Sequence, residues 1–581
     1  MQNSEGAVYF DDFVSHFRGI VAENSDRLAI SFLSDRGEPA AERTLTFGEL
    51  DTQSAAVAGY LREAHGVGER ALLLFAPGHE FLYSFIGCLF AQVIAVPAPV
   101  PTDAKGMERL GKIVRDSDIG VLLTTEALRP AITTWLTESG LDEVRSVVAV
   151  DSIDISTAPS SPFEAPTPDT VAFLQYTSGS TTDPKGVVIT HRNLMTNQRE
   201  IHLVTEATQN DVAAGWLPHF HDMGLIGQLL HPLYVGFPGH YLSPVAFLKR
   251  PMLWLETLSR FGGTMTVAPN FAFEMCTRRT TEDNTAGLDL AHVRIILNGS
   301  EPVHPQTLVD FCERFAPSGL DAKAVYPCYG LAEATLLVSG VRGTGFTVFD
   351  ADADALEDNR VSAATENGPV RPLVGSGVVG VSEVAIVDPA SLERLQNGRI
   401  GEIWVRGETV AQGYWRNEAA TAETFDLGLS GDKGYMRTGD LGCFVGDELF
   451  VTGRLKDVII VNGKNHYPHD LEQTAKSAHP AVELGLTAAF GMGEFPERVI
   501  LVQEFSADAL GEMDAADLKP LLHEAIRRSH GLVVSEIVLV DRKVVSRTTS
   551  GKIRRAEMRD HFRDGRLEDR GAALTGASAS Q

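Results

Sequence analysis

A loop rich in hydroxyl groups and glycine follows a predicted strand and suggests phosphate binding. Residues 176–186 read YTSGSTTDPKG and directly follow the apolar run VAFLQY at 171–176. Backbone N–H groups of such a loop can surround a polyphosphate, and Lys185 can neutralise part of its charge. The loop is not a Walker loop, because Pro184 and Gly186 stand where that motif needs glycine and Ser or Thr. For this segment alone, a Ser/Thr-rich surface turn remains the alternative.

Six further motifs carry residues suited to nucleotide chemistry. They are NGSEP (298–302), YGLAE (329–333), GEIWVRG (401–407), RTGDLG (437–442), GRLKDVIIVNGKN (453–465) and SRTTSGKIRR (546–555). Together with the loop they resemble, in order, the adenylate-forming superfamily of acyl-CoA synthetases, luciferases and peptide-synthetase adenylation domains. The phosphate loop of that family reads Y/F-TSGSTGxPKG, so Thr182 replaces a glycine here and predicts a stiffer or reshaped loop.

The resemblance implies a site for ATP and Mg²⁺. Glu333 resembles the magnesium ligand, and a hard cation that bridges phosphate oxygens favours a carboxylate. Asp440 is similar to the carboxylate that accepts both ribose hydroxyls, and the ring of Tyr329 resembles one side of the adenine site, where an aromatic face can stack. The implied nucleotide-binding residues are Thr177, Ser178, Gly179, Ser180, Thr181, Asn298, Gly299, Ser300, Glu301, Pro302, Tyr329, Gly330, Asp440 and Arg454.

Three side chains are implied as catalytic by the same resemblance. Lys552 resembles the mobile lysine that stabilises charge on the α-phosphate and the attacking carboxylate; without the family it would be interpreted as solvated surface. Lys185 belongs to the phosphate loop, and His221 in HFHDMGL resembles the residue between nucleotide and acyl pocket. Lys456 matches the hinge about which the family's small domain rotates. His219 and His221 could also suggest a metal pair, but no further ligand follows at suitable spacing.

Four segments are most similar to the fatty acyl-AMP ligase branch: WLPHFHDMGLIG (216–227), NGSEPV (298–303), PCYGLAEATLLVSG (327–340) and LKDVIIVNGKNHYPHDLE (455–472). That branch implies activation of a medium- or long-chain fatty acid and transfer to the phosphopantetheine of a holo acyl carrier protein. An acidic insertion at 341–375 is implied to restrain the small domain and to disfavour CoA; a passive surface loop is the alternative. Six residues are candidate walls of an acyl pocket, or else ordinary core: Trp216, Met223, Leu225, Gly227, Phe271 and Phe273.

Two other functions remain open. A fatty acyl-CoA synthetase would share the general motifs and use CoA as acceptor. A catalytically silent nucleotide- or lipid-binding homologue would belong to another class, and the presence of Lys185, Glu333, Asp440 and Lys552 argues against it.

The elements that must position these residues predict an α/β fold. Short β-branched runs such as ALLLF (71–75) and GVLLTT (120–125) alternate with amphipathic segments, which is typical of parallel sheets between helices. The resemblance implies a large N-terminal adenylation domain of α/β subdomains with a distorted barrel (1–455) and a small mobile α+β C-terminal domain (456–570). The tail 571–581 is expected to be disordered.

Composition narrows the class further. A net charge of −27 disfavours general binding to nucleic acid, although the segment 541–570 holds ten Lys or Arg against six Asp or Glu. The five scattered cysteines fit neither a disulfide framework nor a zinc site, so a reducing cytoplasm is expected. Residues 81–101 are uncharged, but Gln92 and three prolines interrupt them, which predicts a buried helix and a strand instead of a membrane span.

Overall fold

The computed structural model describes residues 10–571, except 142–143, 159–162, 178–182, 342, 344, 494–496 and 549–550. Ser178, Gly179, Ser180 and Thr181 of the predicted phosphate loop, together with Thr182, lie outside the described residues. The tail predicted to be disordered also lies outside them from residue 572 onward.

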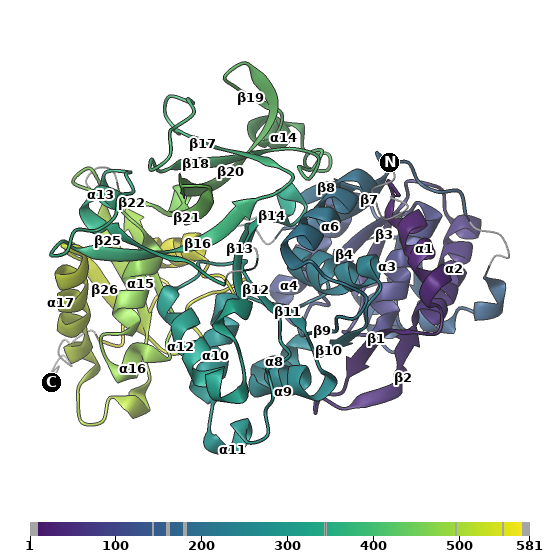
Figure 1. Cartoon of the computed structure of the whole chain (residues 1–581), viewed down its shortest axis with the longest axis horizontal. Coiled ribbons are helices and arrows are strands. Elements are labelled where there is room, and N and C mark those ends of the chain that lie inside the picture. Colours follow the sequence, from purple (N-terminus) through teal and green to yellow (C-terminus); the bar gives the residue numbers. More distant parts are fainter. Residues whose placement is uncertain are drawn as a thin grey trace, which may run out of the picture.

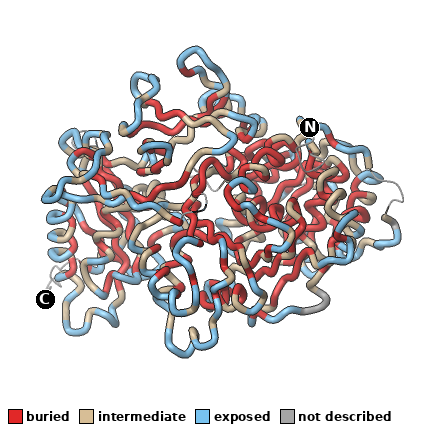
Figure 2. Tube along the Cα trace, viewed as in Figure 1, coloured by how far each residue is buried: buried red, intermediate tan, exposed pale blue. Residues whose placement is uncertain are grey.

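A six-stranded, mostly parallel sheet forms the N-terminal part of the chain. Its strands, in order across the sheet, are β6 (Ser146–Ala149), β5 (Val121–Thr124), β3 (Arg70–Leu74), β4 (Ile94–Ala98), β7 (Val171–Tyr176) and β8 (Gly186–Thr190). Only β8 runs antiparallel to its neighbour, because the predicted phosphate loop turns the chain back at residue 176. Figure 2 shows these strands as buried.

Successive residues of the central strand face two different helix layers. Ala71 and Leu73 belong to the core that includes helices α2 (Phe47–Ala64) and α3 (His79–Ala91). Leu72 and Leu74 belong to a second core with α4 (Ala104–Ser117) and α5 (Arg129–Glu138). A strand buried on both faces reads as a continuous apolar run, which is why ALLLF shows no alternation.

The uncharged segment at 81–101 forms part of this core. It folds into α3, whose residues from Phe81 to Ala91 are all buried, and then into β4. The predicted buried helix followed by a strand is therefore confirmed. Within the described residues, no helix has the length and apolar character needed to cross a membrane.

A second, long sheet changes from parallel to antiparallel along its length. Its parallel part orders the strands β1 (Leu28–Leu33), β10 (Gly239–Tyr241), β9 (Ala213–Gly215), β11 (Met265–Ala268), β12 (Ile295–Asn298) and β13 (Val325–Gly330), with β2 (Pro39–Thr46) antiparallel at its edge. The helices of this region are α1 (Phe13–Asn24), α6 (His191–Thr205), a π-helix (Met223–Leu230), α7 (His231–Val235), α8 (Pro244–Lys249), α9 (Met252–Phe261), α10 (Asn270–Arg279), α11 (Glu282–Thr285) and α12 (Pro305–Phe315).

The antiparallel part begins at β13, in the region where a distorted barrel was expected. It continues through β14 (Leu337–Gly340), β16 (Val370–Val379), β21 (Glu448–Arg454), β20 (Asp432–Val445), β18 (Gly401–Arg406) and β17 (Glu383–Val387). Two further strands pair with this part: β15 (Val348–Asp352) with β16, and β19 (Leu427–Leu429) with β20. The helices of this region are α13 (Ala353–Glu357) and α14 (Glu418–Thr424). Since β13 and β20 belong to one sheet, motifs about 110 residues apart can meet at its surface.

The C-terminal residues form a smaller α+β unit. Its strands are β22 (Ile459–Val461) with β23 (Lys464–His466), and β24 (Thr487–Met492), β25 (Arg498–Glu504) and β26 (Glu536–Val540); its helices are α15 (Pro468–Lys476), α16 (Pro480–Glu483), α17 (Leu518–His530) and α18 (Arg555–Arg563). Two hydrophobic clusters lie wholly within this unit. Figure 1 shows it (yellow-green) at the opposite end of the molecule from the purple N-terminal helices. The mixed α/β fold with a large and a small part agrees with the sequence prediction.

Candidate functional site

Three residues from separate motifs form one hydrogen-bonded group. The Tyr329 hydroxyl donates to Asp440 Oδ2 at 2.9 Å, and Arg454 Nε donates to Asp440 Oδ1 at 2.9 Å. Asp440 and Arg454 are direct partners across β20 and β21, which fixes their approach. Burial and the Asp440 charge raise the pKa of Tyr329 well above its usual value, so its hydroxyl stays protonated. The carboxylate and the phenol ring predicted for ribose and adenine thus share one surface.

The NGSEP motif lies beside this group at the end of β12. Asn298 is fully buried, and neither polar atom of its side chain has a hydrogen-bond partner among the described residues. Gly299 is required by close packing, because a Cβ there would lie 2.9 Å from the carbonyl oxygen of Cys328. Gly330 is more restricted still, because a Cβ there would lie only 1.7 Å from the carbonyl oxygen of Leu336. A buried amide without a hydrogen-bond partner beside the Tyr329–Asp440 pair fits a ligand with a hydrogen-bonding edge, such as a purine.

The side chain of Tyr414 contacts both Glu333 and Lys185. The Tyr414 hydroxyl donates to Glu333 Oε1 at 2.9 Å, and Lys185 Nζ lies 4.8 Å from the centre of the Tyr414 ring. A backbone bridge between Tyr414 and Val187 of β8 holds the ring in place. No cluster of three or more potential metal-ligating side chains occurs among the described residues. Glu333 therefore fits Mg²⁺ only in company with oxygens from a phosphate ligand and water.

Lys552 comes from the small C-terminal unit, like the predicted hinge Lys456. Burial and the charge of Arg454 lower its pKa, whereas the charges of Asp222, Asp440 and Glu301 oppose this shift. Lys552 is nevertheless an exposed residue. The loop before it packs on the large part: a Cβ at Gly551 would lie 2.9 Å from the ring of Phe271.

Two acidic side chains flank this lysine. Asp222 Oδ1 lies 2.7 Å from His221 Nδ1 at the start of the π-helix. Although burial opposes ionisation, His221 and Lys552 hold the pKa of Asp222 below its usual value. Glu301 accepts a 2.6 Å hydrogen bond from the backbone N–H of Phe271, and burial raises its pKa to about 7. His219 lies apart: it is buried against Phe81 and burial lowers its pKa to about 3, so it stays neutral.

The described end of the phosphate loop is held by an arginine. Thr177 N donates to Lys185 O at 3.2 Å, which closes the base of the loop. Arg109 Nη2, from α4, donates to Thr177 O at 2.7 Å. The arginine therefore anchors the point at which the chain leaves β7.

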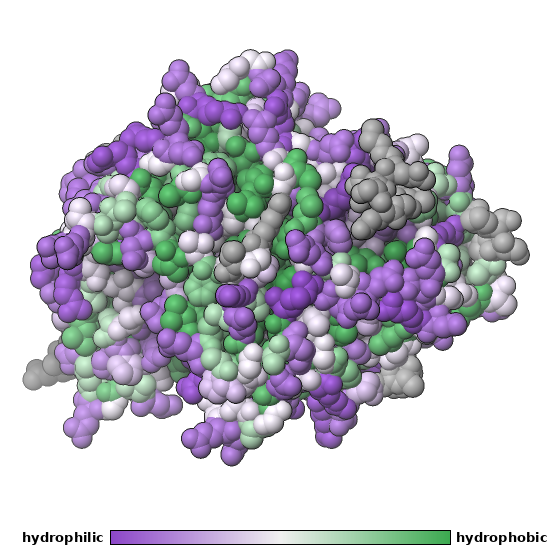
Figure 3. All heavy atoms as spheres, in the orientation of Figure 1, coloured by the Kyte–Doolittle hydropathy of each residue, from purple (hydrophilic) through white to green (hydrophobic). Residues whose placement is uncertain are grey.

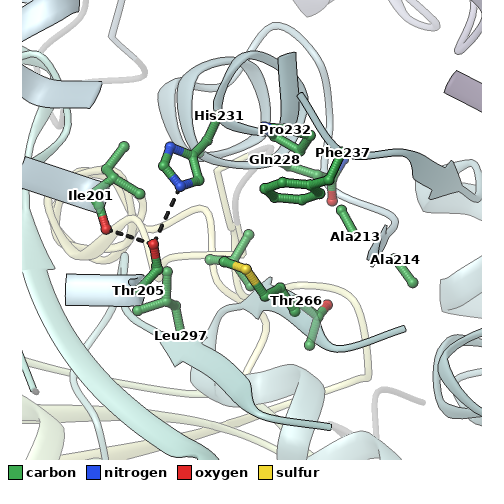
Figure 4. Close-up of a pocket in the computed structure, with 13 residues that line it drawn as sticks. Ile201, Thr205, Ala213, Ala214, Gln228, His231, Pro232, Phe237, Thr266 and Leu297 are labelled. Carbon is green, nitrogen blue, oxygen red and sulfur yellow. Dashed lines mark hydrogen bonds between the residues drawn. The ribbon is translucent and has the colours of Figure 1, made fainter. Parts of the chain in front are cut away.

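The six expected acyl-pocket residues lie in different apolar surroundings, although the rings of Trp216 and Phe271 are in contact, with centres 5.9 Å apart. An apolar cavity of about 30 Å³ lies between α6, the π-helix and strands β9, β11 and β12, and of the six only Gly227 lines it. Figure 4 shows its boundary, where Thr205 lies between His231 Nε2 and the carbonyl of Ile201, at 3.3 and 2.8 Å. Phe273 instead packs on Trp254 and Phe311 in the core, and Trp216 stacks on Phe247 with ring centres 3.7 Å apart.

The insertion packs against both parts of the chain. Lys464 Nζ lies 2.6 Å from Glu357 Oε2, and Asn465 Nδ2 donates to Asn359 Oδ1 at 2.9 Å. Arg371 pairs with Asp470 and covers the ring of Tyr467 at 4.6 Å. Residues of the insertion, of β20 and β21, and Tyr467 also share one hydrophobic cluster. Lys456 is exposed in the turn Leu455–Asp457, whose Asp457 lies 3.0 Å from Arg555.

Sequence reasoning missed Tyr414, Asp222 and Arg109 as members of the site. Asp222 is adjacent to the predicted His221, so the HFHDMGL segment held a signal for it. Tyr414 and Arg109 stand outside the six motifs, and only the fold brings them to Glu333 and Thr177.

On the face drawn in Figure 3, hydrophobic residues are visible within a mostly hydrophilic outline.

Two known families match this chain, each over a different part of it. Residues 17–415 match the family described as "AMP-binding enzyme". Residues 456–571 match "Disco-interacting protein 2-like, AMP domain".

Relatives with similar sequences cover nearly the whole chain. The medium-chain-fatty-acid–[acyl-carrier-protein] ligase JamA of Moorena producens (strain JHB) is 41% identical, covering 94% of both chains. The long-chain-fatty-acid–AMP ligase FadD32 of Mycolicibacterium smegmatis is 34% identical, covering 97% of this chain and 96% of the relative. A solved structure, the fatty acid AMP ligase from Legionella pneumophila, is 35% identical and aligns with a TM-score of 0.75 over 97% of each chain.

Proposed function

Because the chain belongs to the fatty acyl-AMP ligase branch of the adenylate-forming superfamily, we propose a two-step ligase reaction. In the first step ATP and a medium- or long-chain fatty acid form acyl-adenylate and pyrophosphate. In the second, the phosphopantetheine thiol of an acyl carrier protein takes the acyl group. The observation that carries the proposal is the electrostatic coupling of Lys552, from the small C-terminal unit, to Asp222, Asp440, Glu301 and Arg454 of the nucleotide motifs and their neighbours.

The chemistry of the first step requires charge to be stabilised at the α-phosphate. The fatty acid carboxylate attacks this phosphorus, and the bond to the bridging oxygen breaks with its electron pair leaving on pyrophosphate. Lys552 and Lys185 supply positive charge on two sides, and fixed charges of this kind act most strongly where water is excluded. His221, held by Asp222, orients the carboxylate at the mouth of the acyl site.

The nucleotide is bound by one side chain without a hydrogen-bond partner and by two that are paired in its absence. The orphaned amide of Asn298 and the ring of Tyr329 receive adenine, and Asp440 accepts the ribose hydroxyls in place of part of its present bonding. Glu333 holds Mg²⁺, which when bound neutralises phosphate charge. Tyr414 orients the Glu333 carboxylate for this role.

The fatty acyl chain extends from this site toward the cavity beside Gly227. This cavity is too small for a medium- or long-chain acyl group, so its walls must separate for the chain to enter. The apolar lining favours a hydrocarbon over an amino acid or sugar, because burial of each CH₂ contributes about 0.8 kcal/mol.

The insertion makes a carrier protein the preferred acceptor. Transfer requires the small domain to rotate about Lys456, and the contacts of Glu357, Asn359 and Arg371 with that domain oppose a wide rotation. A carrier protein and CoA present the same phosphopantetheine thiol, but CoA also needs a site for its nucleotide part, which a restrained small domain would not complete. The Moorena relative is named as an acyl-carrier-protein ligase, which supports this acceptor.

A small surface on the C-terminal unit suits docking of an acidic carrier protein. Within 541–570, Arg563 and Arg570 are already paired with acidic neighbours, so they add little net field. Arg542, Lys543 and Arg547 are exposed and make no ion pair with the described residues, and Val544 between them is 37% exposed. Reversing Arg542 and Arg547 to Glu should slow transfer to the carrier protein, and more so at low salt, without slowing adenylation.

The proposal is tested by fatty-acid-dependent exchange of pyrophosphate into ATP across a series of carboxylic acids. Acids of about eight carbons and longer should support exchange, and acetate, amino acids and aryl acids should not. If short or aromatic acids are better substrates, the branch-specific function is wrong. Absence of exchange with every acid would favour the catalytically silent alternative.

A further inference from the structure

Two arginines from opposite ends of the chain lie beside the start of the phosphate loop. Arg109 contacts Thr177, the residue directly before 178–182, through the 2.7 Å bond to its carbonyl. One helical turn earlier on the same face of α4, Lys105 Nζ lies 2.6 Å from Glu557 Oε1 of α18. Arg554 Nη1 in turn lies 3.3 Å from Glu557 Oε2, so α4 and the start of α18 form one contact.

The positive charges in this contact exceed the negative ones. Lys105 and Arg554 share the carboxylate of Glu557, whereas Arg109 makes no ion pair with any described residue. Arg554 keeps only 23% of its side chain exposed, and its Nε is buried without a hydrogen-bond partner in the described part of the chain. Burial and the proximity of Arg554 lower the pKa of Arg109, as expected for uncompensated like charges.

Such an arrangement is unfavourable until an anion binds. A half-buried guanidinium with an unsatisfied N–H forms strong, charge-assisted hydrogen bonds with phosphate oxygens, often in bidentate geometry. The position next to Thr177 restricts the anion to one that emerges from the phosphate loop. In the proposed reaction that anion is the leaving group of adenylation.

We propose that Arg109 and Arg554 form a binding site for pyrophosphate at the contact between α4 and α18; this inference rests on the proposed function. The bridging oxygen leaves the α-phosphorus with its electron pair, and the two arginines bind the departing phosphates. Arg554 lies two residues from Lys552, so the site is complete only while Lys552 is in the active site. Bound pyrophosphate therefore holds the small domain in the adenylation position, and its departure permits the rotation that precedes transfer.

Calorimetric titration of the full-length protein with pyrophosphate tests the site directly. Arg554→Met should weaken pyrophosphate binding by about tenfold or more, since a lost hydrogen bond between charged groups has that magnitude. Glu557→Gln should tighten binding, because it removes the carboxylate that competes for both basic partners. Arg528→Met, an exposed arginine of α17, is the matched control and should bind like the parent. Inorganic phosphate, with half the phosphoryl groups, should bind at least about tenfold more weakly than pyrophosphate.

Several results would overturn the site. Binding by Arg554→Met within twofold of the parent would exclude that arginine, and equal affinity for phosphate and pyrophosphate would exclude the assignment to pyrophosphate. If α4 and α18 form only a structural contact, Glu557→Gln will leave pyrophosphate binding unchanged or weaken it, and this readout holds even if Arg554→Met does not fold.

The same titration separates this inference from the proposed function. Arginine-dependent pyrophosphate binding by a protein that adenylates no fatty acid would leave the site standing and refute the function. Normal adenylation with arginine-independent binding would refute the site alone. Added pyrophosphate should also slow transfer from preformed acyl-adenylate in the parent, and slow it less in Arg554→Met.

Discussion

The hydroxyl of Tyr414 donates a 2.9 Å hydrogen bond to Glu333, and the ammonium group of Lys185 lies 4.8 Å from the centre of the Tyr414 ring. One aromatic side chain thus connects the proposed metal ligand with the lysine of the phosphate loop. Burial and the Glu333 charge raise the pKa of Tyr414 far above its usual value, so it remains a hydrogen-bond donor at all physiological pH values.

Replacing this tyrosine tests the metal site without changing its ligand. Tyr414→Phe removes the hydrogen bond that orients Glu333 and keeps the ring under Lys185. We expect the Mg²⁺ concentration for half-maximal pyrophosphate release to rise about tenfold, the lower end of effects from partners of metal ligands. Tyr60→Phe, in α2, is the control. An unchanged Mg²⁺ requirement in Tyr414→Phe would remove Glu333 from the metal.

Lys552→Ala should separate the two half-reactions. The loss of a fixed positive charge at the transition state typically lowers the rate by about 10²- to 10³-fold. Acyl-adenylate formation should fall by at least that range, whereas transfer from supplied acyl-adenylate should be affected much less. Arg528→Ala, on the exposed face of α17, should leave both rates unchanged. Equal losses in both half-reactions would contradict the role of Lys552 in adenylation.

Arg371→Gln should increase the use of CoA. Its ion pair with Asp470 leaves only 18% and 22% of the two side chains exposed, whereas Lys464 in the neighbouring pair is 55% exposed. The more buried pair should restrain the small domain more, because exposed pairs contribute about 0–1 kcal/mol. We expect the rate of acyl-CoA formation to rise at least several-fold while adenylation changes little.

Asp358→Asn provides the comparison for this experiment. Asp358 pairs only with Arg360 among the described residues, within the insertion itself, at 3.3 Å. This variant should use CoA as poorly as the parent. If Arg371→Gln does the same, the insertion does not decide the acceptor.

Glu301 should make stability depend on pH near neutrality. Burial raises its pKa from 4.5 to about 7, so between these values the folded protein binds a proton that the unfolded chain releases. Its contribution to the free energy of unfolding is therefore fully present below about pH 4.5 and is lost as pH rises through 7. Glu301→Gln keeps a neutral side chain, so its Tm relative to the parent should increase from about pH 5 to about pH 8.

Glu313→Gln, on the exposed face of α12, serves as the reference for that measurement. Its Tm difference from the parent should not follow the same pH trend. A pH-independent difference for Glu301→Gln would mean that the carboxyl is already ionised over this range.

Motif order in the sequence predicted the residues of the nucleotide site better than those of the acyl site. Tyr329, Asp440 and Arg454 meet because strand pairing in one sheet fixes their register. Each of these residues has a fixed place in its motif, so recognising the motifs was enough to predict them. The acyl walls depend on how the helices pack. Phe273 faces Trp254 and Phe311 rather than the cavity, and nothing in the spacing of apolar residues distinguishes a core position from a pocket wall.

The sequence also could not show which charged side chains form ion pairs inside the molecule. Basic residues exceed acidic ones at 541–570, yet Arg554 and Arg555 pair with Glu557, Glu472 and Asp457 inside the molecule. Counting charges along the chain cannot show which of them point outward. The contact of Arg109 with Thr177 likewise follows from the packing of α4 beside β7 and β8, with the partners 68 positions apart in the sequence.

The most direct test of the central claim is mass spectrometry of the products formed from ATP, Mg²⁺ and a fatty acid of eight or more carbons. We predict acyl-adenylate and pyrophosphate in the absence of an acceptor, acyl thioester on a holo acyl carrier protein when one is added, and hardly any acyl-CoA when CoA replaces it. Efficient acyl-CoA synthesis by the unmodified protein, or no acyl-adenylate with any fatty acid, would contradict the account.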